Sequence, residues 1–204
     1  MCDQRPADDG NTFRRRHFLL ASAGVGAASL AGCLGGNEGG GDGGQTTAPT
    51  AVTIPEGSTC EVCGMNIRQN PGPITEIFYQ DKQPNGHDNP ARFDSVWEAY
   101  QYEFEKDDAG WTDVAFYVTD YSSVEYRTFE EGGDTFISSN YESSAFVPAT
   151  EVTYVVDSSV KGAMGRDLVP FSKASDAESF QSEFGGSLAT HDEVTPEVIA
   201  GIGQ

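Results

Sequence analysis

The sequence is poor in basic residues, and this shortage excludes one class of partner. Its 204 residues include 12 lysines and arginines against 32 aspartates and glutamates, a formal net charge of −20. Such a surface repels nucleic acid, so we exclude that partner. Acidic residues scattered along the whole chain are typical of proteins adapted to molar salt, where a Debye length of about 3 Å weakens self-repulsion. We therefore predict a salt-loving archaeal source.

Long apolar runs are also missing. The stretch from Phe18 to Leu34 is diluted by alanine, glycine and serine. It falls short of the roughly 20 strongly apolar residues that a membrane span needs. The sequence therefore predicts no membrane-spanning helix in the mature protein.

Sets of residues that would indicate catalysis are absent too. No Ser-His-Asp arrangement or phosphate-binding loop stands out, and the many carboxylates follow from the charge bias. The Cys-x-x-Cys-His signature of c-type haem and the ligand order of a cupredoxin do not occur. The sequence thus favours a binding protein and predicts that the chain is not an enzyme.

The first part of the chain is typical of an export signal with a lipid anchor. A twin arginine within Arg14-Arg15-Arg16 precedes a mild apolar segment and resembles a Tat signal. That segment ends in Leu30-Ala31-Gly32-Cys33, which resembles a lipobox whose cysteine is lipidated and becomes the new N-terminus. We predict a signal peptide over 1–32, a glycine-rich tether over 33–52, and a lipid-anchored location on the outer face of the cell membrane.

Residues 53–204 are predicted to form one α+β domain. Residues 74–79 and 114–118 have the composition of strands, and apolar residues from Phe93 to Phe104 recur at helical spacing, with Asp94 or Ser95 as the cap. Further strands are predicted over 124–128, 152–156, 168–171 and 187–191, with a loop or hairpin tip over 130–144. Ser175 to Glu178 has the pattern of a capping box for a helix that ends at Gly185-Gly186, and a short helix follows from Thr195. Both halves run as a Gly/Met turn, an extended segment, a capped helix and a strand.

Few residues after Cys33 can bind a soft metal. Cys60-Glu61-Val62-Cys63-Gly64-Met65 brings three sulfurs within six residues, and Met164 lies in a second glycine-flanked turn. Thiolate and thioether ligands favour Cu(I), whereas zinc rarely takes a thioether. A zinc site and a disulfide remain open alternatives, because export to an oxidising compartment permits a disulfide. Whether His87 or His191 completes the site also remains open.

Several blocks resemble those of the NosL-type copper lipoproteins, which are linked to maturation of nitrous oxide reductase. The matching blocks are the lipobox at Cys33, Cys60-x-x-Cys63-Gly64-Met65, Phe93-Asp94, and the run from Gly162-Ala163-Met164-Gly165 to Phe171. The resemblance covers about residues 58–192. It implies a monomeric α+β domain of two related small β-α-β type subdomains, similar to the organomercurial lyase fold.

The resemblance also implies a function. Cys60, Cys63, Met65 and Met164 match the sulfur positions of the two motifs and would bind Cu(I). The lipoprotein would deliver copper, through a membrane transporter and maturation assembly, to nitrous oxide reductase. The alternative is a zinc- or disulfide-stapled lipoprotein that docks a partner without copper transfer. A lyase or thiol oxidoreductase is a third hypothesis that rests mainly on fold analogy, which is a weak warrant for activity.

Overall fold

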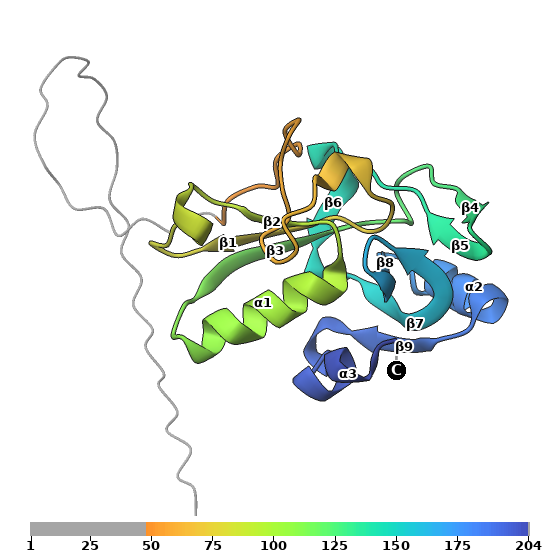
Figure 1. Cartoon of the computed structure of the whole chain (residues 1–204). Coiled ribbons are helices and arrows are strands. Elements are labelled where there is room, and N and C mark those ends of the chain that lie inside the picture. The colour runs from red at the N-terminus through yellow and green to blue at the C-terminus, as the bar shows by residue number, and fades with distance from the viewer. Residues whose placement is uncertain (1–47, 204) are drawn as a thin grey trace, which may run out of the picture. The chain divides into compact units, whose positions relative to one another are not determined.

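A computed structural model describes residues 48–203 of the chain, and these belong to one compact unit. They form a mixed α+β structure with two sheets, as predicted (Figure 1). No helix of residues 48–203 is long and apolar enough to span a membrane. The signal over 1–32, the lipidation site Cys33 and most of the tether lie outside the described residues.

The first sheet has four strands in the order β2-β1-β3-β6, all antiparallel. Its strands and its helix are β1 (Thr75–Tyr79), β2 (Ala91–Phe93), α1 (Val96–Asp108), β3 (Asp113–Thr119) and β6 (Phe146–Pro148). All five residues of β1 are buried, which agrees with its position in the middle of the sheet. In Figure 1, α1 lies along one face of this sheet.

The second sheet has five strands and is built around the long strand β7. Its elements are β4 (Thr128–Glu131), β5 (Asp134–Ile137), β7 (Thr153–Gly162), β8 (Gly165–Phe171), α2 (Ala174–Phe184) and β9 (Ser187–Thr190). One part of β7 pairs with β9, and a later part pairs in parallel with β5. The helix α3 (Pro196–Gly201) follows and packs against α1.

The β7–β8 pair separates two apolar clusters. Tyr154 and Leu168 belong to the cluster that also contains α1 and the first sheet. Val155 and Val169 belong to a smaller cluster beneath α2. Alternate residues of these strands therefore face different cores, as the period of two in a strand requires. This pair joins the halves of the molecule.

Three local predictions differ from the structure. The stretch 130–144, predicted as a loop or hairpin tip, contains such a tip but also the strand β5, because these residues pair with β4 and β7. Residues 124–127 form no strand, because Val124 donates its N–H to Asp120 O in a turn and Tyr126 packs on the Tyr121 ring. The capping box at Ser175 does not form: α2 begins after Lys173, with no side-chain cap. Its entry is fixed by a distant residue, since Asp120 accepts the Ser172 N–H at 2.8 Å.

Candidate metal centre

The cysteine motif folds into a closed turn. A bridge between Thr59 and Asn66 joins its two ends. Within it, the Cys60 N–H donates to Met65 O at 2.9 Å and the Gly64 N–H donates to Cys60 O at 3.0 Å. Gly64 has φ +72°, a conformation that residues with a Cβ rarely adopt. Gly64 therefore allows the backbone to reverse directly after Cys63.

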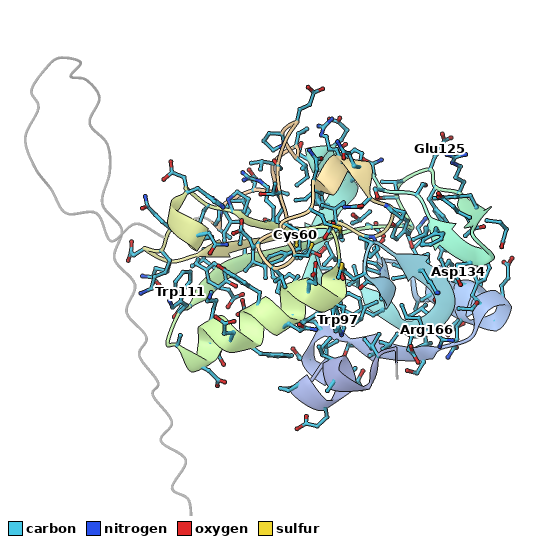
Figure 2. All side chains as sticks on the ribbon, viewed as in Figure 1. Cys60, Trp97, Trp111, Glu125, Asp134 and Arg166 are labelled. Atoms are coloured by element: carbon cyan, nitrogen blue, oxygen red, sulfur yellow. The ribbon has the colours of Figure 1, made fainter. Side chains whose placement is uncertain are left out.

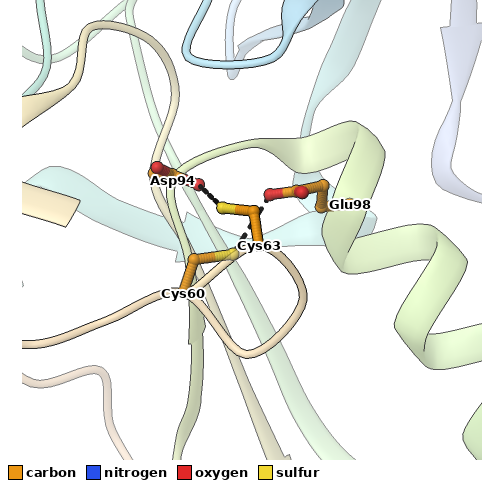
Figure 3. Close-up of side chains that lie close together, drawn as sticks. All are labelled: Cys60, Cys63, Asp94 and Glu98. Carbon is orange, nitrogen blue, oxygen red and sulfur yellow. Dashed lines mark hydrogen bonds between the residues drawn. The ribbon is translucent and has the colours of Figure 1, made fainter. Parts of the chain in front are cut away.

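The start of α1 supplies two carboxylates to the same place. Ser95 caps the helix, and its side chain accepts the Glu98 N–H at 3.3 Å. Asp94 comes immediately before the cap and Glu98 lies four residues after Asp94. Asp94 therefore lies just outside the helix and Glu98 in its first turn, and both side chains reach the turn that carries the cysteines. Figure 3 shows both carboxylates pointing at the two thiols of the turn.

The four side chains form a tight group. The Cys60 thiol donates to Glu98 Oε2 at 3.1 Å, and the Cys63 thiol donates to Asp94 Oδ1 at 3.7 Å. One ligand atom from each residue lies within 4.8 Å of the others. Cys60, Asp94 and Glu98 are buried, whereas Cys63 is partly exposed. An ion could therefore approach from the Cys63 side and be held from the Cys60 side. Figure 2 labels Cys60 of this group and Trp97 of α1.

The charge of this group fits a cation. Within residues 48–203, neither Asp94 nor Glu98 has a basic group within 4 Å. The other Asp94 oxygen accepts a neutral amide hydrogen bond from Asn70 at 2.8 Å. Buried carboxylates are normally paired with a basic group or bound to a metal. Two thiols and two carboxylates without a basic partner form a donor set that a metal ion would complete.

Burial favours the protonated thiols in the absence of metal. It raises the pKa of the Cys60 thiol far above the ordinary value, and the hydrogen bond to Glu98 raises it further. Burial also raises the pKa of Cys63, and the charge of Asp94 adds to this effect. The pKa of Glu98 is raised, first by burial. Since thiolates are the metal ligands, an incoming ion must displace protons from this group.

The structure unites two of the four predicted sulfur ligands. Cys60 and Cys63 meet in the cluster, as their spacing predicts. Met65 is half-buried and lies on the same turn. Met164 lies on a different turn, between β7 and β8, and is 40% exposed. Metal binding by the two methionines stays a prediction.

The two histidines have other partners. His87 Nε2 lies 2.6 Å from Glu61 Oε1, and its Nδ1 lies 2.7 Å from the carbonyl oxygen of Asp88. His191 Nδ1 lies 2.7 Å from the Tyr100 hydroxyl. The cluster found in residues 48–203 consists of thiols and carboxylates and includes neither histidine.

Sequence reasoning missed Glu98, and it named Asp94 only as a possible cap and as part of a block that resembles the family. The available signal is their spacing of four residues across the start of a predicted helix, with Asp94 before the cap and Glu98 in the first turn. With 32 acidic residues in the chain, this spacing does not stand out. The fold that brings the turn onto α1 is needed to select them.

Comparison with known proteins identifies the family. The chain is 27% identical over 151 residues to the copper-binding lipoprotein NosL of Achromobacter cycloclastes, covering 72% of this chain and 70% of that protein. The crystal structure of the copper chaperone NosL from Shewanella denitrificans matches with a TM-score of 0.60 and 27% identity, covering 72% of this chain and 97% of the other. The NosL family model matches residues 51–199, nearly the whole described unit. The chain therefore belongs to the NosL family.

Proposed function

We propose that this chain is an exported lipoprotein that binds one Cu(I) ion at Cys60 and Cys63 and passes it to a copper acceptor. The observation that carries the proposal is the pair of thiols held together at the N-terminus of α1, one buried and one partly exposed. Soft thiolates suit Cu(I). The copper-binding relatives support the choice of metal. Membership in this family also confirms that the chain is not an enzyme.

The arrangement suits transfer as well as binding. Cu(I) tolerates two or three ligands, so an acceptor's ligands can enter before the donor's leave. The partly exposed Cys63 is the residue from which exchange would begin, while the buried Cys60 would leave last. Met65 and Met164 would add thioether ligands that need no deprotonation. The proposed acceptor is the maturation assembly for nitrous oxide reductase, which the NosL resemblance implies.

The proposed location is the outer face of the membrane. Lipidation at Cys33 after Tat-dependent export would anchor the protein, and the tether before the described unit would let it reach a membrane-bound partner. A curated relative is itself named a lipoprotein, which supports the anchor. The strongly acidic composition supports a high-salt habitat.

A direct test is anaerobic titration of the reduced full chain with Cu(I) against a competing chelator, at high salt. We expect one tightly bound ion that excess Zn(II) does not displace. The Cys60→Ser/Cys63→Ser double variant is the matched control, because both proteins carry the same cysteines outside the motif, Cys2 and Cys33 of the unprocessed chain. Equal Cu(I) binding by this variant would reject the site.

A zinc-stapled docking protein is the second candidate. Asp94 and Glu98 are oxygen donors, which zinc accepts beside two thiolates in a four-ligand site. The same titration separates the candidates. Zinc that binds tightly and resists Cu(I) would favour the stapled protein. Zinc that Cu(I) expels would favour the copper donor.

A further inference from the structure

A third buried carboxylate lies beside the metal centre, outside the group of four. Asp167 is 1% exposed and belongs to β8 in the second sheet. Its Oδ1 accepts the N–H of Trp97 in the first turn of α1 at 2.8 Å, and the N–H of Leu168 at 2.8 Å. Its Oδ2 has no hydrogen-bond partner within the described residues. Asp167 thus ties the second sheet to the helix end that carries Asp94 and Glu98.

The same strand leads back to the turn that carries Met164. Gly162 and Gly165 pair at the base of this β7–β8 turn. On one side, a Cβ placed on Gly72 would lie 2.7 Å from Gly162 Cα, so the two backbones are in contact. Gly72 follows the cysteine turn along the chain. On the other side, a Cβ on Gly162 would lie 3.0 Å from Asp167 Oδ2. The turn is therefore wedged between the segment after the cysteines and Asp167.

We propose that Asp167 is a positioning residue of the metal centre, which fixes the β7–β8 turn against α1 so that Met164 reaches the Cys60–Cys63 thiols. This role rests on the proposed function, because it assumes that the thiols bind Cu(I). Asp167 itself does not bind the ion. Asp167 instead holds the β7–β8 turn and the start of α1, which are far apart in sequence, at a fixed distance from each other.

A purely structural role would also explain a buried helix-capping aspartate, so the test must separate the two. The experiment is a double-mutant cycle of Cu(I) affinity with the full-length wild type, Asp167→Ala, Met164→Leu and the double variant. Supporting groups around metal ligands typically change affinity by roughly 10- to 100-fold. We expect Asp167→Ala to weaken Cu(I) binding within that range, and to change it less than about twofold when Met164 is already leucine.

Matched variants exclude a general loss of structure. Asp167→Asn keeps an oxygen that can accept both N–H groups and should retain wild-type affinity. Asp120→Ala removes a comparable tie at the other helix, where Asp120 bonds Ser172, and should leave Cu(I) affinity unchanged. If Asp167→Ala does not fold, Gly162→Ala replaces it in the cycle, because its Cβ would press on Asp167 Oδ2.

Each outcome has a defined meaning. Equal weakening by Asp167→Ala in both backgrounds would show a structural role alone and overturn the proposal. Unchanged affinity in Met164→Leu, or in Asp167→Ala, would overturn it as well. A wild-type chain that binds no Cu(I) would remove the proposed function and this role together, whereas additive variants of a binding wild type would remove only the role of Asp167.

Discussion

Asp120 and Asp167 both join the two halves of the molecule. Each comes from the sheet of one half and accepts hydrogen bonds at the start of the helix in the other half. Asp120 follows β3 of the first sheet and accepts the N–H and hydroxyl of Ser172, just before α2. Asp167 lies in β8 of the second sheet and accepts the Trp97 N–H at the start of α1. Each helix therefore begins at a point that the opposite sheet holds in place.

The surroundings of the two aspartates differ. Both oxygens of Asp120 accept hydrogen bonds, and one of them also accepts the Ser122 N–H. One oxygen of Asp167 has no partner in the described residues, and burial raises the pKa of Asp167 to about 7, with a further contribution from the charge of Glu98. Asp120, whose oxygens are both hydrogen-bonded, has a structural role, whereas Asp167, with one oxygen that lacks a partner, lies beside the metal centre. Unpaired buried charge is thus concentrated at the end of α1, where a metal would use it.

The largest expected effect is a loss of Cu(I) affinity when a cysteine beside the start of α1 is replaced. Cys60→Ser or Cys63→Ser should weaken Cu(I) binding by more than the roughly 100-fold that a supporting residue costs, because a soft ligand is lost. The fold should persist, since serine is close to cysteine in volume. Affinity is measured by chelator competition, with circular dichroism as the check on folding. A loss below tenfold in both variants would remove these thiols from the site.

The next largest effect concerns the hydrogen bonds that Asp120 accepts from Ser172 at the entry to α2. Asp120→Ala should lower the free energy of unfolding by about 1–3 kcal/mol, because buried N–H and hydroxyl donors lose their acceptor. Urea denaturation at fixed high salt measures this change. Cu(I) affinity should stay within about twofold, since supporting residues act on affinity only beside the ligands. A large loss of affinity would contradict the division of roles between Asp120 and Asp167.

The dependence of stability on pH also distinguishes the two aspartates. The folded pKa of Asp167 is above its unfolded value, so the folded state binds the proton more tightly, and stability must fall as pH rises from about 4 to about 7. Glu76, whose pKa burial raises to about 7, contributes in the same direction. Asp167→Asn should therefore flatten the decline of the urea midpoint between pH 5 and pH 7.5 without abolishing it. An unchanged slope in that variant would refute the burial effect.

The smallest effect compares the caps of the two helices. Ser95→Ala should cost about 1 kcal/mol, because the side-chain acceptor for the Glu98 N–H is lost. Lys173→Ala should cost less than about 0.5 kcal/mol, since Lys173 makes no side-chain cap to α2. Thermal or urea unfolding of both variants at one pH measures the difference. Equal costs would mean that the cap of α1 adds nothing to its stability.

Much of the fold could be predicted because its signals are local. The strands near 74–79 and 114–118 and the helix after Ser95 follow from composition, spacing and capping. The error at Val124 arises from a turn that Asp120 begins four residues earlier, and the error at Ser175 arises from the distant contact of Asp120 with Ser172 at the entry to α2. Such a contact leaves no trace in a local pattern.

The site likewise contains a part that local sequence predicts and a part that depends on the tertiary fold. The meeting of Cys60 and Cys63 is a property of a short turn, and sequence spacing is enough to predict it. Glu98 enters only because the turn packs onto α1, which requires the tertiary fold. The placement of the turn that carries Met164 involves the contact of Gly72 with Gly162, across ninety residues of chain, and the relation of Met164 to the thiols stays a prediction. The resemblance to a family, and not local physics, suggested that link.

The central claim is that Cu(I) is held by sulfur at the end of α1, and X-ray absorption at the copper edge tests it most directly. The sample is the Cu(I)-loaded full chain, measured beside the Cys60→Ser/Cys63→Ser variant. We predict a copper coordination shell dominated by sulfur that loses most of its sulfur in the variant. A shell of oxygen and nitrogen in the wild type, or the same sulfur shell in both proteins, would contradict the account.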